Sequence, residues 1–433
     1  MDHGEASGQC SRAKLAVAAP CASVAFQGRF NILSRVKIAI NHTRFSRSGG
    51  IERYIYRLVE RLLSDGHEVH CFARRWEPLE HPRLFFHWVP AIPLGEGVKA
   101  LSFAYFSSYL LGRQRFDVIH GFTKGFRQDV YTDGSGAFDE YLGYLRSASL
   151  WRRVTTFRPL LVYASRKIEA LRYRAPAPPV VLAMSQRTRR QILERHRYPA
   201  DRIEVLHGSA DTAKFRPAAD PKAARALRQS LGASDGAVVA LLVGNDFRRK
   251  GVRTALEAAR GLTPECILWV VGFDRRARSY EAWARSRNLA CRFLGAQPDP
   301  RPFLHAADLF VFPSRYDIFG NAALEAMACG LPCILSAEAG VSEVVSHGED
   351  ALVLARPTDA GELRRHLQRL SDPSERRRIG RAARRTAEQY GLEKNLDRVL
   401  NAYHHVVGQG RAPPPESSEL HERLGFAPRV AIL

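Results

Sequence analysis

The chain has 433 residues, of which 45% are apolar and 25% charged, a composition typical of a globular protein with two or three domains. Its net charge of +21 predicts a polyanionic partner, such as nucleic acid, an anionic membrane surface or a phosphorylated substrate. The seven cysteines form neither a paired framework nor a zinc-ligand spacing, which argues against a disulfide scaffold and indicates a reducing cytosol.

The first half of the chain alternates short apolar strands with amphipathic helices. Residues 1–34 are predicted to be an unstructured extension, and their longest apolar run is too short to cross a bilayer. A helix is predicted over 51–65, where apolar residues recur with a 3.6-residue period. The predicted strands are 35–40, 68–73, 116–120, 180–185 and 202–208. This alternation predicts a parallel sheet with helices on both faces, in an N-terminal domain spanning 35–215.

A second strand–helix series follows a Pro- and Ala-containing stretch, 216–236, that is predicted to be a linker. We expect a C-terminal domain over 237–390, then a helix over 391–408 that returns to the N-terminal domain. Residues 409–433 are expected to be a flexible tail. The fold class is therefore α/β, with two Rossmann-like, doubly wound domains facing each other across a cleft. Ligands of such sheets bind beyond the carboxyl ends of the strands.

The most informative stretch, 313–332, places Asp317 and Glu325 eight residues apart. A turn containing Gly320 separates them, between an apolar strand and a helix. The free N–H groups and positive dipole end of a helix start form a good seat for a phosphate. From the spacing alone, an ordinary strand–turn–helix with two surface acids is the alternative interpretation.

Two adjacent cations, Arg249 and Lys250, follow another predicted strand and precede a helix. Arg can bind a diphosphate through its bidentate fork and Lys as a point charge. Because positive side chains at a helix start oppose its dipole, their position favours a bound anion over a solvated basic surface.

These segments resemble the retaining glycosyltransferases of family 4. Asp317 and Glu325 are similar to the family's E-x7-E signature, with Asp in place of the first Glu. Together with the stretches 244–251 and 269–274, they resemble the lipopolysaccharide core glucosyltransferase I family. The resemblance covers 35–408 and is strongest over 240–345. It implies a GT-B fold and transfer of glucose from UDP-glucose to an inner-core heptose, with retention of configuration.

The resemblance also implies roles for single residues on the donor side. Arg249 and Lys250 correspond to a diphosphate clamp, Glu325 to the acceptor of the ribose hydroxyls, and Asp317 to a catalytic contact with the donor sugar. The shorter Asp side chain leaves the reach of Asp317 open. Further donor contacts are expected from Gly49, Gly50, Gly320, Asn321 and Ala322.

On the acceptor side, His120 ends a strand and resembles a family 4 catalytic residue that touches the donor sugar. The alternative is a structural histidine. Arg127, Asp129 and Asp133 belong to a stretch similar to the acceptor-side loop and are expected to bind heptose hydroxyls or phosphates.

The sequence contains no Asp-x-Asp motif, so we expect no metal site and no cofactor besides the nucleotide-sugar donor. Arg249 and Lys250 would then stabilise the leaving diphosphate. We favour attack from the face that the diphosphate leaves, with the leaving phosphate as base, because Glu325 is expected to be engaged by the nucleotide.

The basic and apolar segment 151–174 predicts docking on an anionic membrane surface, beside a lipid-linked saccharide acceptor at the cytoplasmic, inner leaflet of the inner membrane. A family 4 transferase for exopolysaccharide or another glycolipid is an alternative. A sugar-nucleotide epimerase and a basic nucleic-acid-binding protein are more distant ones. No nucleic acid is expected, because neither an aromatic-interleaved basic platform nor a reading helix is recognisable.

Overall fold

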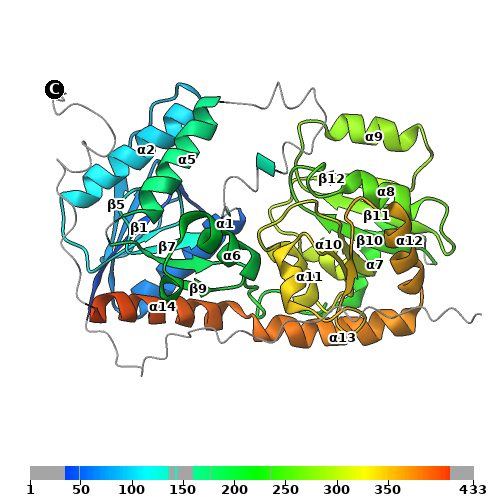
Figure 1. Cartoon of the computed structure of the whole chain (residues 1–433). Helices are drawn as coiled ribbons and strands as arrows, with labels where there is room; N and C mark the ends of the chain where they lie inside the picture. Colours follow the sequence, from blue (N-terminus) through cyan, green and yellow to red (C-terminus); the bar gives the residue numbers. More distant parts are fainter. Residues whose placement is uncertain are drawn as a thin grey trace, which may run out of the picture.

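The computed structural model describes residues 35–47, 49–134, 136, 142–143, 159–175, 177–234 and 236–409. The predicted extension 1–34, nearly all of the predicted tail 409–433, and residues 151–158 of the basic segment lie outside the described residues. Within the described part, two parallel sheets with helices on both sides form two domains (Figure 1). The predicted α/β class with two doubly wound domains is confirmed.

The N-terminal domain is built on a seven-stranded parallel sheet in the order β5-β3-β1-β6-β7-β8-β9. These strands are Leu84–Trp88, Glu68–Ala73, Lys37–Asn41, Val118–Gly121, Val130–Asp133, Val180–Ala183 and Ile203–Val205. Its helices are α1 (Gly50–Ser64), α2 (Gly95–Gly112), α5 (Pro159–Tyr173) and α6 (Gln186–His196), with the 3-10 turn η1 (Ala200–Arg202). Two short strands, β2 (Arg44–Phe45) and β4 (Arg75–Trp76), pair beside it.

The C-terminal domain is built on a six-stranded parallel sheet in the order β12-β11-β10-β13-β14-β15. These strands are Cys291–Gly295, Cys266–Val271, Val238–Val243, Leu309–Phe312, Cys333–Ser336 and Leu352–Leu354. Its helices are α7 (Pro221–Ser230), α8 (Val252–Ala259), α9 (Ala277–Arg285), α10 (Arg301–Ala306), α11 (Asn321–Ala328), α12 (Ala360–Arg369) and α13 (Pro373–Gln389), with the 3-10 turn η2 (Gly340–Val344).

The central strand β10 shows why the strand sequences are continuous apolar runs. Val239 and Leu241 pack into one buried cluster, whereas Val238, Ala240 and Leu242 pack into another on the opposite face. Because successive side chains of a strand alternate between faces, a sheet covered on both sides needs apolar residues at every position.

The predicted linker 216–236 contains a helix, α7, that was not predicted from the sequence. Asp220 caps it by accepting a hydrogen bond from the Lys222 backbone N–H, and Pro221 occupies its first turn, a normal helix start. Ala224 and Leu227 pack against the core of the C-terminal domain. The described structure therefore places α7 with that domain rather than in a flexible connection.

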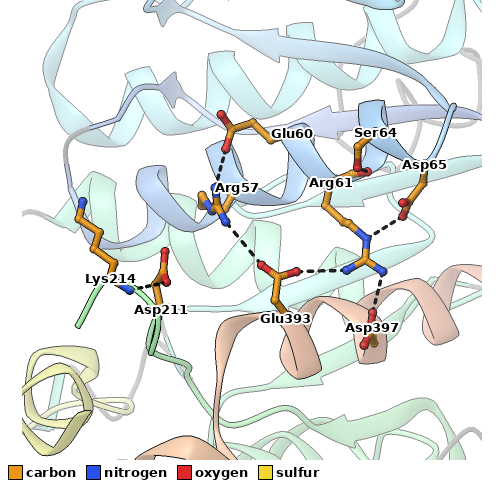
Figure 2. A network of polar contacts seen from close by, with 9 residues as sticks. All are labelled: Arg57, Glu60, Arg61, Ser64, Asp65, Asp211, Lys214, Glu393 and Asp397. Carbon is orange, nitrogen blue, oxygen red and sulfur yellow. Dashed lines mark hydrogen bonds and ion pairs between the residues drawn. The ribbon is translucent and has the colours of Figure 1, made fainter. Parts of the chain in front are cut away.

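After α13, the chain crosses back and α14 (Leu392–Gly408) packs beneath the N-terminal sheet (Figure 1). Ion pairs also join α14 to α1, because Arg61 contacts Glu393 at 3.1 Å and Asp397 at 2.9 Å, as Figure 2 shows. Among the described helices, none combines the length and the apolar character needed to cross a membrane.

Candidate functional site

A cavity of about 1150 Å³ lies between the two domains, lined by residues from both. All of the donor-side residues named from the sequence line it, which places them beyond the carboxyl ends of the parallel strands. They are Gly49, Gly50, Arg249, Lys250, Asp317, Gly320, Asn321, Ala322 and Glu325.

Two helix starts open into this cavity, one from each domain. Gly49 precedes α1 with φ +99°, and Gly320 precedes α11 with φ +103°; neither helix has a side-chain cap within the described residues. Residues that carry a side chain rarely adopt such positive φ values, and a Cβ at Gly320 would lie 2.8 Å from the Phe312 ring. Uncapped N–H groups at both starts can therefore meet an anion in the cavity.

Asp317 is held by the two cations of the predicted clamp. Its Oδ2 accepts hydrogen bonds from Arg249 Nη1 at 2.8 Å and from Lys250 Nζ at 2.5 Å. The Lys250 ammonium also lies 4.2 Å from the centre of the Phe312 ring. The carboxylate and the clamp thus form one partly buried cluster within the C-terminal domain, and both cations already have a negative partner.

The electrostatics of this cluster favour the ionised form of Asp317. Burial alone would raise the pKa of Asp317, but the charges of Lys250 and Arg249 outweigh burial and hold that pKa below its usual value. Burial lowers the pKa of Lys250, and the neighbouring Arg249 adds to this, whereas Asp317 opposes it. Each group therefore compensates the desolvation of the other.

Glu325, in α11, has a different environment, although it lies only eight residues after Asp317 in the sequence. Its Oε1 accepts a hydrogen bond at 2.7 Å from Nη2 of Arg53, which belongs to α1 of the other domain. Burial raises the pKa of Glu325, and the charge of Arg53 offsets this only in part. This pair directly bridges the two domains across the cavity.

The structure places His120 in the core and not in the cavity lining. Its Nδ1 hydrogen-bonds with the Tyr403 hydroxyl at 2.6 Å, and its Nε2 with the Thr132 hydroxyl at 2.8 Å. The ring is fully buried, and burial lowers its pKa to about 3. Because both ring nitrogens are engaged and water is excluded, the structural interpretation fits His120 and the predicted sugar contact does not.

The predicted acceptor-side residues lie apart from one another, because the expected loop contains a short strand, β7. Asp129 precedes β7 and accepts from the Ile119 backbone N–H at 2.8 Å, so it lies at the sheet edge opposite the cavity. Arg127 lies beside Gly112 at the end of α2. Asp133 ends β7, is buried, and accepts from the Gly136 N–H at 2.9 Å. Of the three, only Asp133 is next to cavity-lining residues.

Two further cations, one that lines the cavity and one that links the two domains, have no sequence signal. Lys124 lines it, and burial lowers its pKa to about 8. Arg187 at the start of α6 contacts Glu338 at 3.0 Å and the Asp317 carbonyl at 3.1 Å, again across the domains. Single cations in loops and helices carry no distinctive pattern, so no local signal marked these positions.

The basic segment 151–174 is described only from residue 159, where it forms α5. Arg166 and Arg174 are exposed, but Arg172 is buried against the Tyr131 ring, 3.8 Å from its centre. Ile168 and Tyr173 are buried as well, whereas Tyr163 remains exposed. Fewer cations and apolar groups of this helix are therefore available to a membrane than the sequence indicated.

Among the described residues, no group of three or more His, Cys, Asp or Glu side chains is clustered as metal ligands would be. In the cavity, Arg249, Lys250 and Lys124 provide positive charge. The arrangement can bind a diphosphate between cations and helix starts and can stabilise charge that develops on it.

Comparison with known proteins gives two family matches. The model described as "Glycosyltransferase Family 4" matches residues 48–128, and that described as "Glycosyl transferases group 1" matches residues 224–386. Together they include both helix starts and the Arg249–Lys250 and Asp317–Glu325 segments.

Curated relatives span most of the chain. O-antigen chain mannosyltransferase B of Escherichia coli is 27% identical over 82% of this chain and 95% of its own length. The lipopolysaccharide glucosyltransferase WaaG of Escherichia coli K12 is 24% identical, covering 74% of this chain and 86% of WaaG.

Solved structures share the fold. The crystal structure of WaaG has a TM-score of 0.72 at 21% identity, covering 84% of this chain and 98% of that one. Anabaena Alr3699/HepE, solved with UDP-glucose, has a TM-score of 0.67 at 17% identity, covering 86% and 100%. These likenesses establish the arrangement of the two domains.

Proposed function

Because the chain belongs to the family 4 glycosyltransferases, with the GT-B fold, we propose that it transfers a hexose, glucose from UDP-glucose, to a lipid-linked saccharide with retention of configuration. The observation that supports this best is the partly buried cluster of Arg249, Lys250 and Asp317 beside the uncapped start of α11. Such a cluster suits a nucleoside diphosphate sugar, which needs cations for its phosphates and a carboxylate for its hydroxyls.

On the donor side, Arg249, Lys250 and the N–H groups of Asn321 and Ala322 would bind the diphosphate. In the structure, Asp317 Oδ2 pairs with both cations. A bound diphosphate would also pair with these two cations. The Asp317 carboxylate could then accept hydrogen bonds from the donor sugar. Glu325 would accept the ribose hydroxyls, and the resemblance of HepE, solved with UDP-glucose, supports a uridine nucleotide.

The chemical step would be attack on the anomeric carbon from the face that the diphosphate leaves. The acceptor hydroxyl gives its proton to the leaving phosphate oxygen, the new glycosidic bond forms, and the bond to UDP breaks. Arg249 and Lys250 stabilise the negative charge that grows on UDP, and the two domains position donor and acceptor. The reaction would need no metal, because these cations take its part.

The acceptor would be the inner-core heptose of lipopolysaccharide. The similarity to WaaG, a lipopolysaccharide glucosyltransferase, supports lipopolysaccharide, and the heptose follows from the resemblance of the sequence to the core glucosyltransferase I family. Lys124, Gly134 and Gly136 line the N-terminal side of the cavity, where the acceptor would bind. The exposed Tyr163 and Arg166 of α5, together with the exposed Arg174 just after its end, would contribute to reversible docking on an anionic inner leaflet.

A second candidate function is mannosyl transfer to a growing polysaccharide. The observation that favours it is the higher identity and wider coverage of O-antigen chain mannosyltransferase B relative to WaaG. This candidate uses the same cavity and clamp and differs in the donor sugar and the acceptor.

A donor screen followed by turnover tests both. UDP, GDP and their sugars are titrated by calorimetry, and the best donor is incubated with core-truncated lipopolysaccharides, with and without EDTA. We expect UDP-glucose binding, glucosylation of a heptose-terminated core, and an α-linked product by NMR. Preference for a GDP-sugar supports the second candidate, and absence of any sugar-nucleotide binding contradicts both. For variants of the Arg249–Lys250 clamp, Arg253→Ala is a matched control, because the exposed Arg253 side chain pairs with Glu257 on α8.

A further inference from the structure

The contact between Arg53 and Glu325 is the feature that the proposed mechanism leaves unused. Arg53 lies on α1 and Glu325 on α11, and both residues line the main cavity and a side pocket of about 250 Å³. The pair therefore forms part of the wall between these two spaces. The Arg53 guanidinium is also 5.7 Å from the centre of the Phe215 ring, whose side chain is buried.

The hydrogen bond to Arg53 uses one oxygen of the Glu325 carboxylate. In the described structure the Oε1 atom accepts from Arg53, and the described hydrogen bonds assign no donor to Oε2. A carboxylate has lone pairs for further donors on both oxygens. Glu325 can thus hold Arg53 with one oxygen and accept a ligand hydroxyl with the other.

The remaining charged groups around Glu325 do not replace Arg53. Lys214 favours the ionised carboxylate, whereas Asp299 and Asp211 disfavour it. Arg57, one turn further along α1, is directed to Glu60 and Glu393 instead (Figure 2). Arg53 is the cation that makes a hydrogen-bonded ion pair with Glu325 in the described part of the chain.

We propose that Arg53 is a positioning residue for the nucleotide: it orients the Glu325 carboxylate toward the ribose and ties nucleotide binding to the closed arrangement of the two domains. The inference rests on the proposed function and deepens it. Because Arg53 and Glu325 belong to different domains, the ribose contact is fully formed only when the domains approach as they do here. By linkage, bound nucleotide then favours that approach, and the approach favours nucleotide binding.

The inference predicts a pH signature. Burial raises the pKa of Glu325, and Arg53 counteracts this. Without Arg53, the pKa rises further, so the carboxyl of the variant is protonated at a higher pH than that of the wild type. Ribose binding that depends on the ionised carboxylate should then weaken at low pH in the variant more than in the wild type.

The test measures UDP affinity by calorimetry at pH 6.0 and 8.5 for wild type, Arg53→Ala, Arg53→Lys, Glu325→Gln and the double variant Arg53→Ala/Glu325→Gln. We expect Arg53→Ala to weaken UDP binding about tenfold, the loss of one charge-assisted contact, with the larger loss at pH 6.0. Arg53→Lys should recover part of the affinity. In the Glu325→Gln background, Arg53→Ala should cost little more.

Arg57→Ala is the matched control, with the same charge removed from the same helix, and should bind UDP as the wild type does. Small-angle scattering adds a domain readout, because UDP should compact the wild type more than Arg53→Ala. Should Arg53→Ala not fold, Arg53→Gln takes its place in every arm. Wild-type affinity in the Arg53 variants, or an equal loss in the Glu325→Gln background, would overturn the inference alone. A wild type that binds no nucleotide would overturn the proposed function and the inference with it.

Discussion

Asp317 and Glu325 lie eight residues apart in the sequence, yet the fold places them in opposite electrostatic situations. Asp317 has two cationic partners from its own domain, and its pKa is lowered despite burial. Glu325 has one cationic partner from the other domain, and burial keeps its pKa raised. A shared motif thus contains one carboxylate that is stabilised locally and one that depends on domain arrangement.

The difference indicates how the two acids contribute. The Asp317 cluster is complete within the C-terminal domain and should persist whether the domains are open or closed. The Glu325 pair exists only across the cavity. We therefore expect changes in the first cluster to affect the chemical step and the binding of the donor phosphates. Changes in the second should affect the binding of the ribose.

The largest effect is expected from Lys250→Met, which keeps the side-chain length and removes the buried charge. One charge-assisted hydrogen bond to a phosphate is worth about 1.5–3 kcal/mol, so UDP affinity should fall by about tenfold to a hundredfold. Calorimetry with UDP checks this. Unchanged affinity in both this variant and Arg249→Ala would show that the clamp does not hold the phosphates.

An intermediate effect is expected from Asp317→Asn. The amide keeps the shape but no longer compensates Arg249 and Lys250, and it binds the donor sugar less strongly. Turnover should fall by about tenfold or more while UDP affinity changes little, the pattern of a contact made in the transition state. Steady-state kinetics and UDP titration check the split. Full activity in Asp317→Ala would show that the shorter acid makes no catalytic contact.

The smallest effect is expected in stability, where the two acids should behave differently because their pKa shifts have opposite signs. The lowered pKa of Asp317 contributes stability above the pKa of the unfolded chain, and this is lost as the pH falls through the folded pKa. Asp317→Asn should therefore lower the melting temperature at pH 7 but not in acid. The raised pKa of Glu325 means that its ionised form is disfavoured, so Glu325→Gln should not destabilise at pH 7. Thermal unfolding at several pH values measures both, and equal losses would contradict the comparison.

Much of the donor side could be predicted because its residues lie within single strand–turn–helix segments. Gly320, Asp317 and the α11 start are fixed by local geometry once β13 and α11 form. Arg249 and Lys250 follow β10 in the same way, and parallel strands bring these ends together at one edge. The sequence could therefore predict the residues of the C-terminal domain that line the cavity.

The rest depended on contacts between distant parts of the chain. Arg53 meets Glu325 across 272 positions, and His120 meets Tyr403 across 283, so neither environment has a local signature. The placement of Asp129 depended on recognising β7, whose four residues are too few for a clear period. The helix α7 was missed because its alanines and flanking prolines resemble a linker.

The packing of α14 into the N-terminal domain has a consequence for biosynthesis. Leu396, Val399 and Tyr403 of this helix belong to the buried cluster beneath β1, β3 and β6. A ribosome delivers the strands of this domain long before it delivers these residues, and chains are made at about 5–20 residues per second. For tens of seconds the nascent N-terminal domain would therefore expose an apolar groove, which makes the emergence of α14, the last of the described helices, the step that completes the first domain.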